Sequence, residues 1–162
     1  MGKTRISPDE CLSGKEYLSP GTLHRRSLLK SKSIKISVTL PVSPDEVFLA
    51  LTDKKLIARW CGQRGKIAPR VGGKIEMFDG WVKGKVRTYK PGESLAYTWL
   101  PGDWPADAEE SLVTYSLTKS GSGTTVNLTH SHFPNPTELK NHKKGWTEYV
   151  FDPLKKYFSL RK

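Results

Sequence analysis

The residues of this chain best suited to chemistry are three histidines in its last third, His130, His132 and His142. His130 and His132 stand two positions apart, so on a strand they project from one face, and His142 follows in a helical segment. Imidazole is a common zinc ligand, but zinc is held by a tetrahedral ligand set larger than a pair. No cysteine or carboxylate at a matching spacing completes the set. The sequence therefore favours hydrogen-bonded or partly exposed histidines, and we expect neither a metal ion nor a cofactor.

Glu76 and Asp79, together with His130, are the other candidate acid–base groups, as a cyclase or hydrolase would require. Such a role needs a side chain with a perturbed pKa inside a cavity. Charges beside a hairpin turn are more often solvated, and this interpretation is favoured here. We therefore predict no catalytic residue, and an enzyme of the cyclase or dehydratase type is the weakest alternative.

Cap and alternation signals predict the elements that position these side chains. Residues 43–46 (SPDE) form a capping box with proline at the first helical position, which predicts a helix over 44–51. Asp53 caps a second short helix, which ends at Gly62. Before them, residues 34–40 alternate apolar and polar side chains, the pattern of a half-buried strand.

A series of hairpin-connected strands follows. Asp79-Gly80 is typical of a type I′ turn, because both central residues need positive φ. Residues 90–93 (KPGE) indicate a type II turn, with proline second and glycine third. Consecutive hairpins make the sheet antiparallel. The strands are predicted over residues 74–78, 81–89, 94–99, 112–118 and 125–133.

The last predicted element is one long helix over residues 138–160, capped by Thr137. Its apolar side chains recur at steps of three and four residues, which gives it one buried stripe. Pro153 lacks a backbone donor and is expected to kink or split the helix near residues 149–152. At 1.5 Å per residue the helix would reach about 34 Å, enough to cross a small sheet.

Composition restricts the class of protein. The chain has 162 residues and a net charge of +11, of which +4 lies in residues 1–33 and +7 in the remainder. Basic residues are spread along the chain without a nucleic-acid-binding motif, so no specific nucleic acid is expected. Cys11 and Cys61 lack metal-ligand spacing and fit a reducing compartment. No apolar run approaches the roughly 20 residues that span a bilayer, so we expect a cytoplasmic protein without membrane insertion.

Six short segments carry a family resemblance through their order: residues 56–60 (LIARW), 71–74 (VGGK), 82–86 (VKGKV), 90–95 (KPGESL) continuing to Trp99, 124–130 (TTVNLTH) and 145–146 (GW). Together they resemble the helix-grip SRPBCC superfamily, which includes birch-pollen-allergen-like and START lipid-binding proteins. The closest likeness is to the C-terminal domain of activators of the heat shock protein 90 ATPase and their stand-alone homologues. The resemblance covers about residues 34–160.

The resemblance implies an α+β helix-grip fold. It has a curved antiparallel sheet of about six or seven strands, two short helices after the first strand, and one long C-terminal helix across the sheet, enclosing a cavity. Residues 34–162 are expected to form this domain, and residues 1–33 a basic flexible N-terminal extension. The family supplies no universal catalytic residue.

Two functions fit this fold. The favoured one is a non-catalytic protein that holds a small apolar or amphipathic ligand between the sheet and the C-terminal helix, since aromatic rings with polar tips suit such a site. For any single ring, core packing is the more common role. The alternative is a co-chaperone-like partner that docks on a heat shock protein 90 homologue and stimulates its ATPase in a stress response. With either function we expect a monomer or weak homodimer. The pocket candidates are Trp60, Met77, Trp99, Tyr115, His130, Trp146 and Tyr149.

Overall fold

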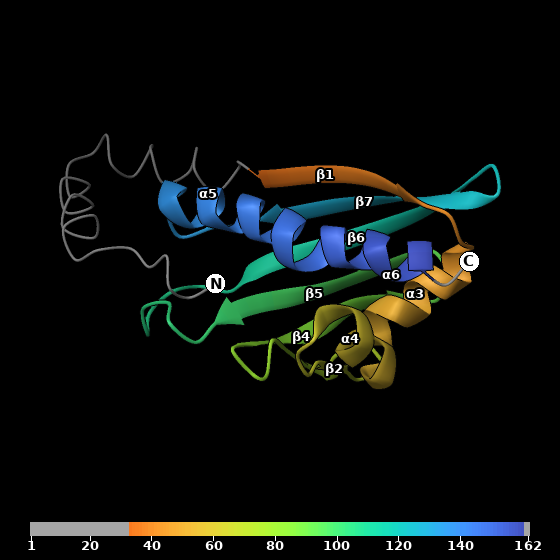
Figure 1. Cartoon of the computed structure of the whole chain (residues 1–162). Helices are drawn as coiled ribbons and strands as arrows, with labels where there is room; N and C mark the ends of the chain where they lie inside the picture. The colour runs from red at the N-terminus through yellow and green to blue at the C-terminus, as the bar shows by residue number, and fades with distance from the viewer. Residues whose placement is uncertain (1–32, 161–162) are drawn as a thin grey trace.

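The structure, a computed structural model, describes residues 33–160. Residues 1–32 of the predicted extension, and with them Cys11, lie outside this range. Within it, the chain folds as one antiparallel sheet with helices packed against it, as the helix-grip resemblance implies (Figure 1).

Seven strands within residues 33–160 form the sheet, in the order β1-β7-β6-β5-β4-β3-β2. All neighbouring strands are antiparallel, as predicted from the hairpins. β1 and β7 pair although they lie at opposite ends of the sheet-forming sequence, and this contact completes the sheet. The strands are β1 (Ser33–Leu40), β2 (Lys66–Ile67), β3 (Lys74–Met77), β4 (Val82–Lys90), β5 (Ser94–Pro101), β6 (Ser111–Ser120) and β7 (Gly123–Ser131).

Two short helices connect β1 to β2: α3 (Pro44–Thr52) and α4 (Lys54–Cys61). The predicted capping box is present, because Ser43 Oγ accepts from the amide of Glu46 at 3.3 Å and the Glu46 carboxylate accepts from the amide of Ser43 at 3.4 Å. Asp53 caps α4 with its carboxylate, as predicted. Local sequence thus determines where both helices begin.

The turn between β3 and β4 has the two predicted positive φ angles but is longer than the predicted two-residue turn, because the last paired residues are Met77 and Val82 and Phe78 also has a positive φ of 54°. Asp79 and Gly80 have φ values of 58° and 91°, and the amide of Trp81 donates to the Phe78 carbonyl at 3.1 Å. The Asp79 carboxylate also accepts from the amide of Arg64 at 2.7 Å. The turn is therefore fastened to the loop that follows α4.

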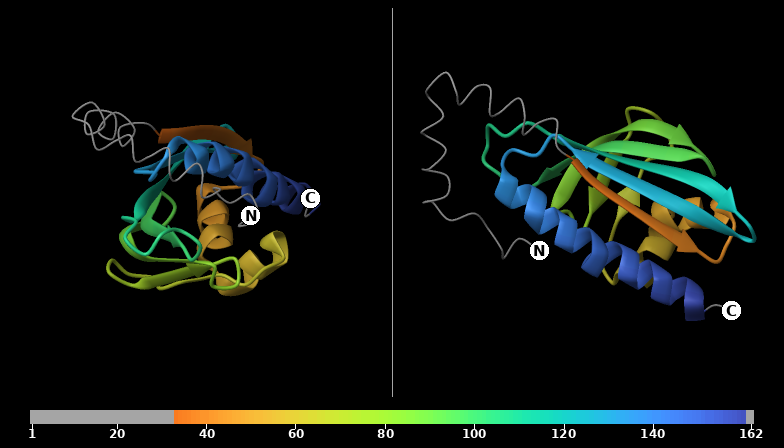
Figure 2. Two further views of the ribbon diagram at one scale, coloured as in Figure 1. Left: turned by 90° about the vertical axis from the view of Figure 1, so that its left-hand side faces the viewer. Right: turned by 90° about the horizontal axis from the view of Figure 1, so that it is seen from above.

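The C-terminal helix runs along one face of the sheet, as Figure 2 shows from two sides. It consists of α5 (Pro136–Gly145), the π-helical segment η2 (Trp146–Phe151) and α6 (Asp152–Leu160). The irregularity predicted near residues 149–152 takes the form of this π segment. Pro153 is the second residue of α6, so the residue without an amide hydrogen lies just after the point where the regular α-helical bonding pattern is interrupted.

The start of the C-terminal helix differs from the prediction. Asn135, and not Thr137, is the cap: its side-chain oxygen accepts from the amide of Glu138 at 2.9 Å. Pro136 occupies the first helical position. Proline is favoured there because its fixed φ suits a helix and its missing amide hydrogen has no partner to lose. Thr137 therefore lies inside the first turn.

Candidate functional site

Four of the seven pocket candidates meet between the sheet and the C-terminal helix. Trp99 on β5, Tyr115 on β6 and His130 on β7 face Trp146 at the start of η2. Ring centroids lie 5.1 Å apart for Trp99 and Trp146, 6.0 Å for Tyr115 and Trp146, and 5.7 Å for His130 and Trp146. All four side chains are buried. We call these residues, with His142 and Ser111, the aromatic–histidine cluster.

His130 lies at the centre of a hydrogen-bonded chain. The Trp146 indole donates from Nε1 to His130 Nδ1 at 2.9 Å, so Nδ1 is the unprotonated nitrogen. His130 Nε2 then carries the hydrogen and donates to Ser111 Oγ at 2.7 Å. Ser111 in turn donates to the Trp99 carbonyl at 2.9 Å. The neutral imidazole therefore has a partner at each nitrogen.

His142 on α5 repeats this pattern. The Trp99 indole donates from Nε1 to His142 Nε2 at 3.2 Å, and His142 Nδ1 donates to the Glu138 carbonyl at 2.9 Å. The two imidazole rings, His130 and His142, are 5.4 Å apart. Each tryptophan indole of the cluster thus donates a hydrogen bond to the unprotonated nitrogen of one histidine. A proton added to that nitrogen would point at the indole N–H, which is also a donor.

Burial holds both imidazoles in the neutral state. Desolvation lowers the pKa of His142 from 6.5 to about 4, although the Glu138 carbonyl and the charge of Asp103 act in the opposite direction. Desolvation, with a smaller contribution from His142, lowers the pKa of His130 well below 6.5. The side chain of His142 also lies 3.5 Å from the Glu138 carboxylate, a contact that becomes an ion pair only if the ring is protonated. Burial is the larger effect because both rings are almost completely covered.

The other three pocket candidates lie apart from the cluster. Trp60 is buried under α3, where its indole donates to the Ala50 carbonyl at 2.7 Å. Met77 is buried against the loop that follows α4, with its sulfur close to Gly65. Tyr149 is 40% exposed on η2. A π turn holds more residues than an α turn, so residues in η2 point in other directions than regular α-helical spacing predicts.

The remaining candidates for acid–base or metal chemistry do not converge. β7 ends at Ser131, and His132 has a φ of 69° and an exposed side chain, so His132 does not share the buried face of His130. The predicted strand over 125–133 is therefore too long. Glu76 and Asp79 are exposed beside α4, far from the interior that His130 occupies. Residues 33–160 hold no group of three or more His, Cys, Asp or Glu side chains arranged to bind a metal.

Trp104, in the acidic loop between β5 and β6, turns inward. Its ring lies 5.7 Å from that of His142 and 6.5 Å from that of Phe133. The indole Nε1 of Trp104 and the Oδ1 of neighbouring Asp103 are buried without a hydrogen-bond partner among the described residues. A donor and an acceptor are therefore left unpaired at one edge of the aromatic–histidine cluster.

A different feature lies on the outside of the sheet. A cleft of about 450 Å³ lies between α4, the edge strand β2 and the β3–β4 turn. The only ion pair among its described side chains joins Arg64 Nε to Asp79 Oδ1 at 3.4 Å. The cleft is lined by Lys54, Lys55, Ala58, Arg64, Gly65, Lys66, Glu76, Asp79 and Gly80.

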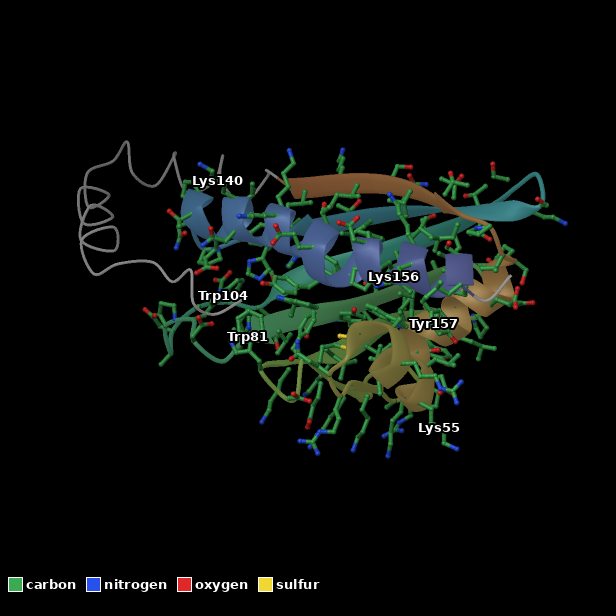
Figure 3. The ribbon with its side chains drawn as sticks, viewed as in Figure 1. Lys55, Trp81, Trp104, Lys140, Lys156 and Tyr157 are labelled. Carbon is green, nitrogen blue, oxygen red and sulfur yellow. The ribbon has the colours of Figure 1, made fainter. Side chains whose placement is uncertain are left out.

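The cleft continues onto the outer face of β3 and β4. Lys66 and Glu76 line the cleft and are directly opposite each other in the sheet, and Glu76 is in turn opposite Lys83. Nitrogen-tipped side chains gather along this side of the molecule, on the side where Lys55 is labelled (Figure 3). We call this region the basic surface; it comprises Lys54, Lys55, Arg64, Lys66, Lys74, Lys83, Lys85 and Arg87, with Glu76 and Asp79.

Sequence reasoning missed Ser111 and the basic surface. Nothing local marks Ser111, since its role depends on the pairing of Trp99 with Ser111 across β5 and β6. The basic surface had a visible signal: Lys83, Lys85 and Arg87 alternate along β4 with the period of a strand. Within residues 33–160, no helix combines the length and apolar character of a membrane span.

The curved antiparallel sheet with a long helix across one face defines the protein as an α+β helix-grip domain. The sequence model of the family described as activator of Hsp90 ATPase homolog 1-like protein matches residues 41–159. The chain therefore belongs to that family, which confirms the resemblance seen in the sequence.

Known relatives show how far the likeness extends. Activator of 90 kDa heat shock protein ATPase homolog 1 of Mus musculus is 26% identical over 125 residues, covering 77% of this chain and 36% of the relative. The chain spans about a third of the length of the curated relatives it matches.

Two solved structures agree with the fold. An HSP90 activator from Plasmodium falciparum has a TM-score of 0.72 at 24% identity, covering 78% of this chain and 96% of that one. CalU16 from Micromonospora echinospora has a TM-score of 0.67 at 28% identity, covering 78% of this chain and 76% of that one. Both confirm the helix-grip architecture predicted from the sequence.

Proposed function

We propose that this domain is a co-chaperone-like partner that docks on a heat shock protein 90 homologue and stimulates its ATPase. The observation that carries this proposal is the closed hydrogen bonding of the aromatic–histidine cluster. Every ring nitrogen of Trp99, Trp146, His130 and His142 is bonded within the protein. A ligand site usually keeps a few polar groups available to orient its ligand. In this cluster the side chains serve the core.

The family and the charge distribution support the same function. The Mus musculus relative named above is an activator of the 90 kDa heat shock protein ATPase by its name, which supplies the class of partner. The domain also presents a concentrated positive surface, and such surfaces guide association with acidic proteins. The activity is carried by protein contact, so the proposal assigns no catalytic residue to this chain.

The test combines binding and turnover. The heat shock protein 90 homologue of the same organism is purified, and its steady-state ATPase rate is measured with increasing amounts of this protein. We expect direct binding by isothermal titration calorimetry and a rate that rises to saturation over the same concentration range. Absence of binding would refute the proposal. Binding without a rise in rate would retain the docking part and remove the activation part.

A second candidate function is the binding of a small apolar or amphipathic ligand, and one observation favours it. Trp104 Nε1 and Asp103 Oδ1 are buried and unpaired at the edge of the cluster. An unpaired buried polar atom costs free energy, and a bound hydroxyl-bearing ligand would relieve that cost. The π segment η2 lies beside the same cluster, and π segments occur frequently at functional sites.

This second candidate has its own test. A panel of fatty acids, flavonoids and polyketide-like compounds is screened by thermal shift against the protein and against Trp104→Phe. We expect a binder to raise the melting temperature of the parent protein and to lose much of that effect in the variant, which lacks the indole donor. A panel without any stabilising compound, or equal shifts in both proteins, would exclude this use of Trp104.

A further inference from the structure

Positive charge is concentrated on one part of the domain. The basic surface holds eight basic and two acidic side chains, a formal charge of +6. Residues 33–160 as a whole hold eighteen basic and thirteen acidic side chains, a formal charge of +5. The remainder of the described domain is therefore close to neutral. The net positive charge of residues 33–160 therefore comes from the basic surface.

Strand pairing brings these charges into rows. Lys74 lies directly opposite Lys85, and Glu76 lies between Lys66 and Lys83. Directly opposite side chains share one face of a sheet. Neighbouring strands are about 5 Å apart and alternate residues along one strand about 7 Å apart. The outer face of β3 and β4 is thus a small array of cations with a regular spacing.

The array has little internal compensation. Within residues 33–160, no carboxylate forms a salt bridge with Lys66, Lys74, Lys83, Lys85 or Arg87. Lys74 and Lys85 are like charges directly opposite each other, and such a pair is destabilising on a sheet. The repulsion between these basic side chains is not offset by salt bridges within the described domain. A surface of this kind fits an anionic partner.

We propose that the basic surface docks an extended acidic segment of a partner protein. Alternate carboxylates of that segment face Lys83 and Lys85, which precede the β-bulge of β4 at residues 86–88, and one end of the segment lies in the adjoining cleft. The match is geometric, because an extended polypeptide repeats its side chains on one face at the same interval as β4 does. That the partner is a heat shock protein 90 homologue rests on the function proposed above. That the partner segment is acidic and extended rests only on the charges and spacing of the basic surface.

Single-stranded nucleic acid fits this surface less well. Binding to it combines positive charge with aromatic side chains on which bases stack. The exposed large apolar residues of the described chain are Leu49, Val71, Tyr149 and Leu160. Only one is aromatic, and Tyr149 belongs to η2 on the C-terminal helix, away from the basic surface.

The experiment uses the full chain and three fluorescein-labelled probes. They are a peptide of Glu-Ser repeats, a Gln-Ser peptide of equal length, and a single-stranded oligonucleotide of the same net charge as the acidic peptide. Binding is followed by fluorescence anisotropy at low and at physiological salt. We expect the acidic peptide to bind with an affinity that falls as salt rises, because the contacts are exposed ion pairs. The Gln-Ser peptide is expected not to bind.

Two charge-reversal variants localise the site. Lys83→Glu combined with Lys85→Glu is expected to weaken binding of the acidic peptide at least about tenfold. Lys140→Glu combined with Lys144→Glu changes the net charge equally, but on exposed positions of α5, and is expected to stay within about twofold of the parent. Lys55→Glu, in the cleft, is a second site variant should the strand pair fail to fold. Circular dichroism melts check that each variant is folded.

The outcomes separate this inference from the proposed function. Equal losses in the two double variants, or tighter binding of the oligonucleotide than of the acidic peptide, would overturn the inference. A heat shock protein 90 homologue that binds the parent and the β4 double variant equally well would also overturn it, while leaving the proposed function standing. If the acidic peptide binds at the basic surface and the chaperone does not bind at all, the proposed function fails and the docking surface remains.

Discussion

Acid should destabilise this domain through His142. The ring is neutral in the folded protein because burial lowers its pKa to about 4, whereas the unfolded chain has a pKa near 6.5. As the pH falls below 6.5, the unfolded state takes up the proton first, so stability present above that pH is lost progressively until about pH 4. The difference of about 2.5 pH units corresponds to about 3 kcal/mol, since one unit is about 1.4 kcal/mol.

The variant His142→Gln measures this contribution. Glutamine cannot titrate, but its amide oxygen can still accept from the Trp99 indole. Urea unfolding at pH 7 is expected to show a loss of about 1–2 kcal/mol for imperfect replacement of the buried ring. Between pH 6.5 and pH 4, however, the parent should lose about 3 kcal/mol more than the variant. Carboxylates that do not interact with His142 titrate in both proteins and cancel in this difference.

His132→Gln is the matched control, because His132 is exposed and outside the aromatic–histidine cluster. Comparison with His132→Gln shows how much of the change in His142→Gln depends on the buried position of the ring. His130, whose pKa is also lowered, still titrates in His142→Gln, so that variant should keep some sensitivity to acid. Parallel profiles for the parent and His142→Gln from pH 7 to pH 4 would refute the conclusion that burial keeps His142 neutral.

Two further predictions concern local structure, and both are measured by urea unfolding at pH 7. Gly84→Ala should cost about 3 kcal/mol, because the added Cβ would collide with the Thr98 carbonyl oxygen. Gly121→Ala should cost about 1 kcal/mol for its φ of 61° alone, since no described atom lies within 4 Å of that Cβ. Equal losses at the two glycines would contradict the close approach of β4 and β5. Asn135→Ala should cost about 1 kcal/mol by removing the cap of α5, and Asn135→Ser should keep most of that stability because serine is also a good cap; similar losses in both would show that the cap lies elsewhere.

Some of this protein could be predicted from the sequence because the information is local. A capping box, a turn with two positive φ angles, or an alternating strand depends on residues within a few positions of each other. The segment order then restricted the fold to the helix-grip class. The cap of the C-terminal helix was missed because Asn135 and Thr137 are both capable caps. The position of Pro136 between them decides in favour of Asn135.

Only the tertiary structure decided which side chains meet. His130 bonds to Ser111 and Trp146 because β6, β7 and the C-terminal helix converge there, and no spacing within the chain encodes that convergence. Trp104 lies in an acidic loop, yet its ring packs against that of His142. The concentration of lysines likewise arises from strand register, which places residues from three strands and α4 on one face. Contacts between distant segments, set by packing and sheet register, thus decide the site, while local propensity decides the elements.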